Sequence, residues 1–122
     1  MRIYGEVGDT SGKFARPKGI AIDKQGRMHV ADAAFQNVQT FDTNNGKLLM
    51  AYGQPETGEG LSLPAAVKVD YDNVALFKRY AAPNFNVEYL ILVTSQVAPN
   101  KIDVFGFGQM AGTGKSQENV PK

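Results

Sequence analysis

Short stretches of alternating apolar and polar residues dominate the first half of the chain. Residues 18–23 place Ile20 and Ile22 on one side of an extended strand, and similar alternation recurs three more times before residue 53. A period of two is typical of a half-buried β-strand. Strands are therefore expected at 18–23, 27–32, 37–42 and 47–52. The links 24–26 and 43–46 contain Gly or Asn, which tolerate the positive φ of tight turns, so one antiparallel sheet is predicted.

The second half of the chain repeats this pattern. The segment Pro17–Asp23 corresponds to Pro64–Asp70 at an offset of 47, with apolar residues and the closing Asp in equivalent places. Residues 28–32 then correspond to 91–95 at an offset of 63, and residues 37–41 correspond to 101–105 at an offset of 64. The increase in offset indicates an insertion of about sixteen residues in the second copy, over 72–87. Four antiparallel strands in about 45 residues are the size of one β-propeller blade, so two blades are predicted.

The insertion contains a short helical pattern. A helix is expected over Asn73–Tyr80, with Asn73 as its N-cap and Pro83 ending it. Leu76, Phe77 and Tyr80 fall at helical spacing, so they are expected to pack the helix on its own blade. The alternative is a helix that binds a partner. Aromatic residues are dense here and could either anchor the helix or form a stacking surface: Tyr71, Phe77, Tyr80, Phe85 and Tyr89.

Four motifs of the first copy together resemble one full NHL repeat. They are Gly12–Phe14, Pro17–Asp23, Gly26–Asp32 and Asn37–Phe41, which fall in order at the spacing of that family. The second copy is similar but departs at two positions, where Ala66 replaces the equivalent of Gly19 and Ser95 replaces the equivalent of Asp32. The resemblance covers residues 1–108 and implies an all-β fold of four-stranded antiparallel propeller blades with one short inserted helix.

The resemblance also sets the expected domain organisation. The first repeat is placed at 6–53, the second at 54–108 with its helical insertion at 72–87, and a flexible polar tail at 109–122. Families of this kind close six blades into a ring. With a helix inserted in its last blade, this chain resembles NHL-repeat proteins of metal-reducing bacteria, which are encoded near multihaem cytochromes. This implies a periplasmic or extracellular location and a multihaem cytochrome as partner.

The strand count is uneven at the two ends of the chain. Met1–Gly5 matches the end of an outermost strand, Leu49–Gly53, whereas a Gly-rich polar segment follows the predicted third strand of the second blade. Arg2–Tyr4 is therefore expected to pair with Lys101–Phe107 of a neighbouring copy, or to join further blades. Repeat proteins generally need at least about three units to bury a continuous core, so further copies or blades are expected to complete a ring, for example three copies.

The composition narrows the classes of chemistry. The chain has 122 residues, 13 basic and 12 acidic side chains, and no cysteine. Disulfides, thiolate metal sites and c-type haem attachment are therefore excluded. No concentrated basic patch favours nucleic-acid binding, and no apolar stretch is long enough for membrane insertion or forms the core of a signal peptide.

Few residues suggest a reaction centre. His29 is the only histidine and is expected to be structural. Asp23, Asp32 and Asp70 end strands, where a short carboxylate accepts backbone N–H bonds, although carboxylates from several blades could also converge on a metal. Gly108–Ser116 nearly matches a phosphate-binding loop by count, but the following 117–122 is too short for the helix that such a loop needs.

The sequence therefore predicts no catalytic residue, no cofactor and no metal site. The predicted function is a non-enzymatic protein-binding scaffold that forms part of a larger ring or complex. The alternative is a fragment of a metal-dependent propeller enzyme of the lactonase or amidating-lyase type. Such an enzyme would require metal ligands from other blades, because two blades with one histidine cannot supply them.

Overall fold

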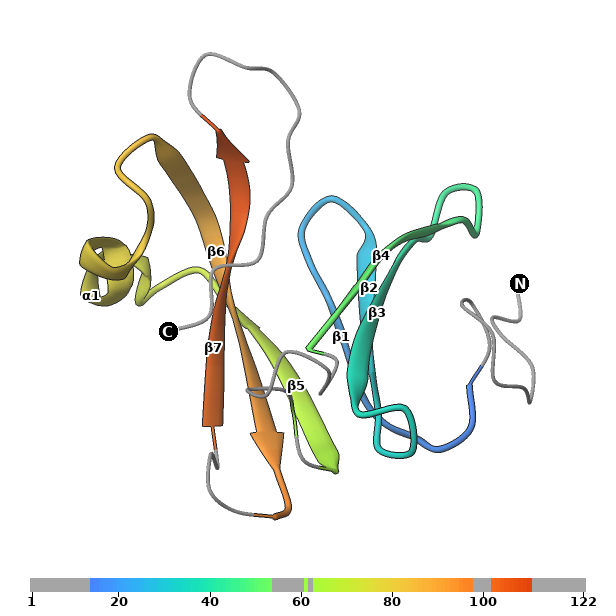
Figure 1. Cartoon of the computed structure of the whole chain (residues 1–122). Helices are drawn as coiled ribbons and strands as arrows, with labels where there is room; N and C mark the ends of the chain where they lie inside the picture. The colour runs from blue at the N-terminus through green and yellow to red at the C-terminus, as the bar shows by residue number, and fades with distance from the viewer. Residues whose placement is uncertain (1–13, 54–60, 62, 98–101, 111–122) are drawn as a thin grey trace.

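The computed structural model describes residues 14–53, 61, 63–97 and 102–110, which form two antiparallel sheets lying face to face (Figure 1). Sheet 1 has the strand order β1-β2-β3-β4, and sheet 2 has the order β5-β6-β7. The strands of sheet 1 are β1 (Pro17–Ile22), β2 (Arg27–Asp32), β3 (Asn37–Asp42) and β4 (Leu48–Tyr52). The all-β fold and the four strands of the first repeat are confirmed, with bounds that differ from expectation by one residue in β1 and β4.

The turns of sheet 1 form as their residues predict. Gly26 has a φ of +83° in the link between β1 and β2, and Gly46 has a φ of +75° in the link between β3 and β4. A side chain at either position would strain the backbone, because L residues rarely adopt this region. Glycine at these two points therefore allows consecutive strands to pair as tight hairpins.

Sheet 2 repeats the register of sheet 1. It consists of β5 (Pro64–Asp70), β6 (Phe85–Ser95) and β7 (Ile102–Met110). Pro17 lies opposite Asp32 in sheet 1, and Pro64 lies opposite Ser95 in sheet 2. In both sheets the pairing shifts by one residue directly after this proline. The sequence repeat is therefore a structural repeat that extends to the same irregularity.

The hairpin of β6 and β7 is longer than expected. Phe85 pairs with Met110, so the hairpin extends beyond the last paired residue of β5, Asp70. The insertion expected at 72–87 therefore ends before Phe85, and regular structure continues two residues beyond 108. The cause is visible in burial: Phe85 and Tyr89 are buried, so the strand pattern begins earlier than the repeat alignment indicates.

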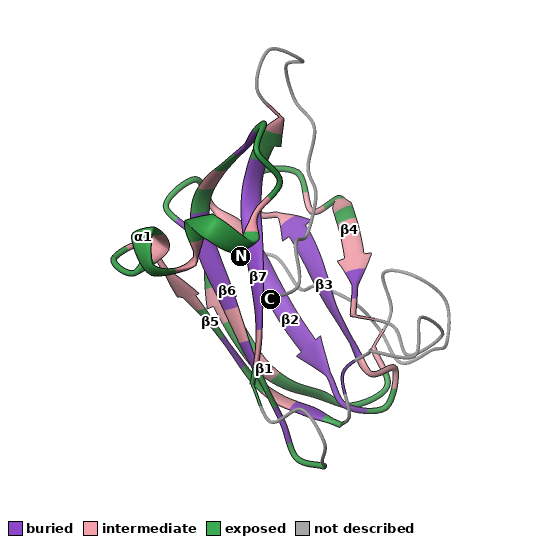
Figure 2. Ribbon diagram, turned by 60° about the vertical axis from the view of Figure 1, so that its left-hand side comes forward, coloured by how far each residue is buried: buried purple, intermediate pink, exposed green. Residues whose placement is uncertain are grey.

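The main core lies between the two sheets. Figure 2 shows buried residues concentrated along β2, β3, β6 and β7. This core unites buried side chains of both sheets and one residue of the link between them: Ala31, Val38, Tyr52, Leu61, Val67, Tyr89, Ile91, Val93, Phe105 and Phe107. A smaller cluster of Met28, Val30 and Phe41 lies on the opposite face of sheet 1.

The insertion forms less helix than expected. It contains the single turn α1 (Val74–Phe77) and the 3₁₀ turn η2 (Lys78–Tyr80), on the side of sheet 2 that faces away from sheet 1 (Figure 1). Asn73 makes no capping bond with its side chain. Leu76 is 67% exposed, so the expected packing is wrong for this residue. Tyr80 is 49% exposed but borders, together with Phe77, a hollow over Leu90 and Val104 of sheet 2.

Several expected features lie in residues that the structure does not describe. The strand Arg2–Tyr4, Lys101, most of the Gly108–Ser116 loop and the tail from residue 111 lie outside the described residues. Predictions about them stay predictions. Within the described part, neither short helix is long and apolar enough to cross a membrane.

Candidate functional site

The polar side chains of the two sheets meet at the turn that follows β1. Asp23 is almost fully buried there, and its Oδ1 accepts the backbone N–H of Gln25 at 2.9 Å and that of Arg27 at 2.8 Å. This is the role predicted for a carboxylate at a strand end. The second oxygen, Oδ2, accepts the Nε–H of Arg27, so the carboxylate is also part of an ion pair.

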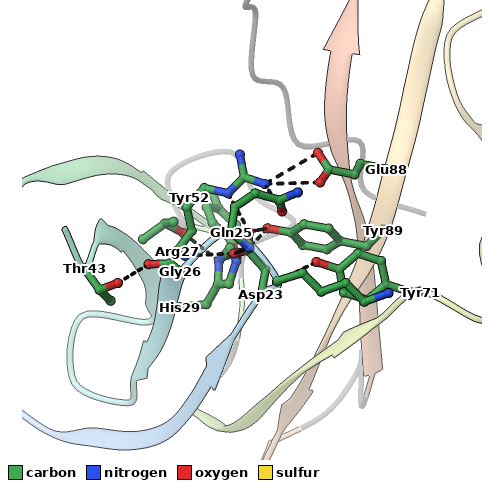
Figure 3. A network of polar contacts seen from close by, with 12 residues as sticks. Asp23, Gln25, Gly26, Arg27, His29, Thr43, Tyr52, Tyr71, Glu88 and Tyr89 are labelled. Atoms are coloured by element: carbon green, nitrogen blue, oxygen red, sulfur yellow. Dashed lines mark hydrogen bonds and ion pairs between the residues drawn. The ribbon is translucent and has the colours of Figure 1, made fainter.

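Tyr89 crosses from sheet 2 into this turn (Figure 3). Its hydroxyl donates to Oδ2 of Asp23 at 2.6 Å and lies 3.0 Å from Nε2 of His29. Nδ1 of His29 lies 2.7 Å from Oγ1 of Thr40. Because the tyrosine proton goes to Asp23, Nε2 is the protonated nitrogen and Nδ1 is the acceptor, with the hydroxyl of Thr40 at 2.7 Å and that of Tyr52 at 3.3 Å as its donors. A continuous path of donors therefore leads from Thr40 through His29 and Tyr89 to Asp23.

The electrostatics of the buried groups agree with this order. Burial lowers the pKa of His29 to about 4, so the ring is neutral at pH 7. Burial and the neighbouring Asp23 raise the pKa of Tyr89, which keeps its proton. Burial acts to raise the pKa of Asp23, but hydrogen bonds from Tyr89 and Arg27 outweigh it, and the pKa is lowered. The single buried charge of this path is therefore the Asp23 carboxylate, balanced by Arg27.

Arg27 links the turn to the aromatic side chains of sheet 2. Its guanidinium carbon lies 4.5 Å from the ring centroid of Phe107, and that ring stacks on Tyr89 with centroids 4.8 Å apart. Its Nη2 also lies 3.3 Å from Oε2 of Glu88. A guanidinium over an aromatic face gains cation–π attraction, so Arg27 holds sheet 1 to sheet 2 by stacking as well as by charge.

Tyr71 contacts the same turn from the end of β5. Its hydroxyl accepts the backbone N–H of Lys24 at 2.8 Å, and the Nζ of Lys24 lies 4.2 Å from its ring centroid. The ring also packs on Tyr89, with centroids 5.0 Å apart. We call the set of these residues the inter-sheet network: Asp23, Lys24, Arg27, His29, Thr40, Tyr71, Glu88, Tyr89 and Phe107.

The inter-sheet network joins the two sheets, and its central side chains are buried between them. His29 and Tyr89 are fully buried, and Asp23 is 6% exposed. The buried polar groups of Asp23, His29 and Tyr89 all take part in hydrogen bonds within or between the sheets. Among the described residues, no group of three His, Asp or Glu side chains could hold a metal ion. This geometry suits a permanent contact between two repeats.

The other predicted carboxylates have local roles. Asp32 accepts the backbone N–H groups of residues 15, 16, 34 and 35. It thereby connects the segment before β1 to the turn that follows β2. Asp70 accepts the backbone N–H groups of residues 72 and 73 and the side-chain amide of Asn73. Both follow the predicted pattern of a short carboxylate that caps backbone donors.

The aromatic residues around the insertion do not form one cluster. Tyr71 and Tyr89 contact sheet 1, whereas Phe85 is buried at the start of β6. Only Phe77 and Tyr80 belong to the insertion itself, and they border an apolar hollow with Leu90 and Val104. The expectation that these aromatics anchor the inserted helix is therefore wrong for Tyr71 and Tyr89, whose rings join the two sheets.

The sequence did not reveal Arg27, Glu88 or Phe107 as members of the inter-sheet network. A weak signal was available, because Arg27 begins a strand directly after the Gly26 turn and Phe107 ends an apolar run. Neither position identifies its partner. Contacts such as Arg27 to Glu88 depend on how the sheets stack.

Two antiparallel sheets with a shared register, packed face to face, define a repeat protein of blade-like sheets. No family model matches the chain. Human "NHL repeat-containing protein 3" is 29% identical over 117 residues, which cover 84% of this chain and 33% of that protein. Mouse "NHL repeat-containing protein 3" is 36% identical over 70 residues, which cover 57% of this chain and 19% of that protein. These similarities support the NHL-repeat family that the motifs indicated.

A shorter match is to bovine "E3 ubiquitin-protein ligase TRIM71", with 42% identity over 38 residues. It covers 31% of this chain and 4% of that protein. The chain thus spans about a third of the human NHL-repeat relative and less of the others. The resemblance to bacterial proteins encoded near multihaem cytochromes stays a prediction.

Proposed function

We propose that the chain is a non-enzymatic scaffold that binds a protein partner and forms part of a larger NHL-type β-propeller. The observation that carries the proposal is the use of its polar side chains. In the described part, the buried histidine, tyrosine and carboxylate at the sheet contact all serve to join two repeats. A side chain engaged in this way contributes to a rigid frame, and a rigid frame can present exposed loops to a partner.

The insertion is the element best placed to contact that partner. Leu76 and Tyr80 are exposed large apolar residues, and Lys78 and Arg79 beside them are also exposed. Arg79 holds its guanidinium carbon 5.1 Å from the ring centroid of Tyr80. Aromatic and arginine side chains are enriched at protein interfaces, because they bury a large area and also form hydrogen bonds. The insertion therefore combines exposure with the side chains that interfaces favour.

The similar proteins agree with this proposal in different degrees. The two NHL repeat-containing proteins are named for the repeat alone. The name of TRIM71 includes a ligase activity, but only 4% of that protein matches this chain. We do not extend the ligase activity to these two sheets.

The proposal is tested with a photo-crosslinking amino acid at position 76 or 80 of the full chain, in cells that produce it. The control carries the same group at Leu49, which is 41% exposed on β4. We expect one protein to be captured from positions 76 and 80 and not from 49. With that protein purified, Leu76→Asp should weaken binding by about tenfold or more, and Leu49→Asp by less than about twofold.

Two results would contradict the scaffold function. The first is equal affinity of the Leu76→Asp variant and the unmodified chain for the captured protein. The second is stoichiometric zinc or calcium in the purified chain together with lactone hydrolysis or amidating-lyase turnover. The second result would support the alternative of a propeller enzyme fragment.

A further inference from the structure

The insertion carries the one pair of adjacent basic residues in the sequence, Lys78 and Arg79. Both side chains are exposed. The guanidinium of Arg79 contacts its own neighbour, because Nη2 donates to the hydroxyl of Tyr80 at 3.1 Å. The pair therefore lies open on the side of sheet 2 that faces away from sheet 1 (Figure 1).

Few interactions hold the backbone of this segment in place. No residue from 71 to 84 is buried, and the single turn of α1 has no side-chain capping bond. Its backbone bonds outside the strands stay within the insertion and the first residue of β6: Leu76 N–H to Asn73, Ala81 N–H to Lys78, and Phe85 N–H to Ala82. A segment with few buried contacts opens at a low free energy. The insertion can therefore become extended while every strand of both sheets stays paired.

Other basic residues of the described part lie in backbone that cannot open so cheaply. Lys68 is in the middle of β5 and pairs with Leu92. The carbonyl of Lys47 accepts the backbone N–H of Asp42 at 2.9 Å and so closes the hairpin of β3 and β4, although its side chain is exposed. Lys24 donates its backbone N–H to Tyr71 across the two sheets. Exposure of a basic side chain is thus common here, and weak tethering of the backbone is what distinguishes Lys78 and Arg79.

We propose that the peptide bond between Arg79 and Tyr80 is a cleavage site for a serine endoprotease specific for paired basic residues. The serine of the protease attacks the carbonyl carbon of Arg79, the bond to the nitrogen of Tyr80 breaks, and that nitrogen takes up a proton. Water then hydrolyses the ester, which leaves a carboxylate on Arg79 and restores the serine. One water is consumed and no other reactant is needed. The inference does not depend on the proposed partner.

The cleaved chain stays assembled, because the structure holds the two fragments together on both sides of the cut. Fragment 1–79 contains sheet 1 and β5, and fragment 80–122 contains β6 and β7. Strands β5 and β6 stay paired from Asp70 with Leu90 to Pro64 with Ser95. The hydroxyl of Tyr89 still reaches Asp23, and both fragments contribute to the main core. Cleavage therefore releases the insertion and leaves the two sheets in contact.

The test uses the purified full chain and a purified serine endoprotease of this specificity, under native conditions, with the fragments identified by mass spectrometry. The matched control is Gln25→Arg, which places a second basic pair with Lys24 in the turn between β1 and β2. Residue 25 is exposed, but its backbone N–H is held by Asp23 at 2.9 Å. Synthetic peptides that cover residues 74–84 and residues 20–30 of the control variant give the cleavage rate of each pair without the fold.

We expect one cut in the unmodified chain, after Arg79, and none in Arg79→Gln. In the Gln25→Arg variant, the bond after position 25 should be cut at least about tenfold more slowly than the bond after Arg79, once each rate is divided by that of its peptide. The fragments 1–79 and 80–122 should elute together in size-exclusion chromatography and separate in urea. Circular dichroism should show an unchanged strand signal after the cut.

Three results would overturn the inference. The first is a folded chain that stays intact while the peptide of residues 74–84 is cut. The second is equal corrected rates after positions 25 and 79, since the weak tethering of the insertion would then not matter. The third is separate elution of the two fragments in native buffer. All of these measurements use purified components without the captured protein, so their failure is distinct from failure of the proposed function.

Discussion

The substitution Gly19→Ala tests the closest contact between the two sheets. The added Cβ would lie 2.8 Å from the Cα of Ala66, 3.1 Å from the N of Val67 and 3.2 Å from the O of Ala65. All three atoms belong to the backbone of β5, so no side-chain rotation can relieve the overlap. The two first strands must separate by a few tenths of an ångström, and the inter-sheet core between them loosens.

Two opposing effects set the size of the change. Overpacking of this kind costs about 1–3 kcal/mol, whereas replacing glycine by alanine lowers the entropy of the unfolded chain and stabilises by about 0.4–1 kcal/mol. A net loss of about 1–2 kcal/mol in the free energy of unfolding is therefore expected. For a folded unit of this size, this corresponds to a decrease of roughly 4–16 °C in the melting temperature.

Gly106→Ala is the matched control. Its added Cβ would meet the nearest methyl group of Val87 at 3.5 Å, which is ordinary van der Waals contact. The control should change the free energy of unfolding by less than about 0.5 kcal/mol or raise it slightly. Both variants are compared with the unmodified chain by urea unfolding, followed by far-ultraviolet circular dichroism. If Gly19→Ala is as stable as Gly106→Ala, the close approach of β1 and β5 is refuted.

Three further predictions concern the inter-sheet network and the insertion. Burial lowers the pKa of His29 from 6.5 to about 4, so the unfolded chain takes up a proton before the folded chain does as the pH falls. The free energy of unfolding should therefore decrease by about 3 kcal/mol between the unfolded and the folded pKa of His29. The substitution His29→Gln should remove this contribution to the pH dependence, measured by urea unfolding at several pH values. Tyr89→Phe should cost about 1–3 kcal/mol at pH 7, because buried Asp23 loses a donor; an unchanged urea midpoint would contradict the bond between the sheets. Leu76 is exposed, so Leu76→Ala should change the free energy of unfolding by less than about 0.5 kcal/mol, whereas Phe77→Ala at a half-buried position should lower it by about 1–2 kcal/mol. Equal decreases in the melting temperature of the two variants would argue against the observed exposure.

The features that could be predicted from the sequence are those that depend on neighbouring residues. Gly26 adopts positive φ because its turn connects two strands directly, and the alternation in β2 and β3 defines their bounds within a residue. Asp32 and Asp70 bind backbone donors within a few residues of the strand ends. These partners are close in sequence, so residue type and spacing were sufficient, whereas the bonds from Asp32 to the backbone of residues 15 and 16 depend on the pairing of β1 with β2.

The insertion could not be predicted as well, because its length lies below what local preference can determine. A helix of about two turns gains little from propensity and depends on packing for its stability. Leu76 and Tyr80 have helical spacing, but Leu76 is 67% exposed, whereas Tyr80 borders the hollow over Leu90 and Val104 together with Phe77. The helical spacing of these residues therefore did not predict which of them contact sheet 2.

The inter-sheet network could not be predicted for a different reason. The bond from Tyr89 to Asp23 joins residues 66 positions apart and requires both the stacking of two sheets and the correct side of β6. The pairing of β6 with β7 shifts between Val87 and Tyr89, which changes the side to which following residues point. An alignment of repeats does not contain that shift.

The network also distinguishes the two ends of the repeat array. The repeat equivalents of Tyr71 and Tyr89 in sheet 1 are Lys24 and Gly26, at offsets of 47 and 63. The face of sheet 1 that carries Ile20 and Ile22 therefore has no tyrosine at these positions with which to reach an Asp23-like carboxylate on a neighbouring sheet. A sheet that docks there would rely on apolar contact with Ile20 and Ile22, without the buried bonds that join sheets 1 and 2. Because the stability of repeat proteins is approximately a sum of neighbour contacts, the contact between sheets 1 and 2 should be the last of the array to open.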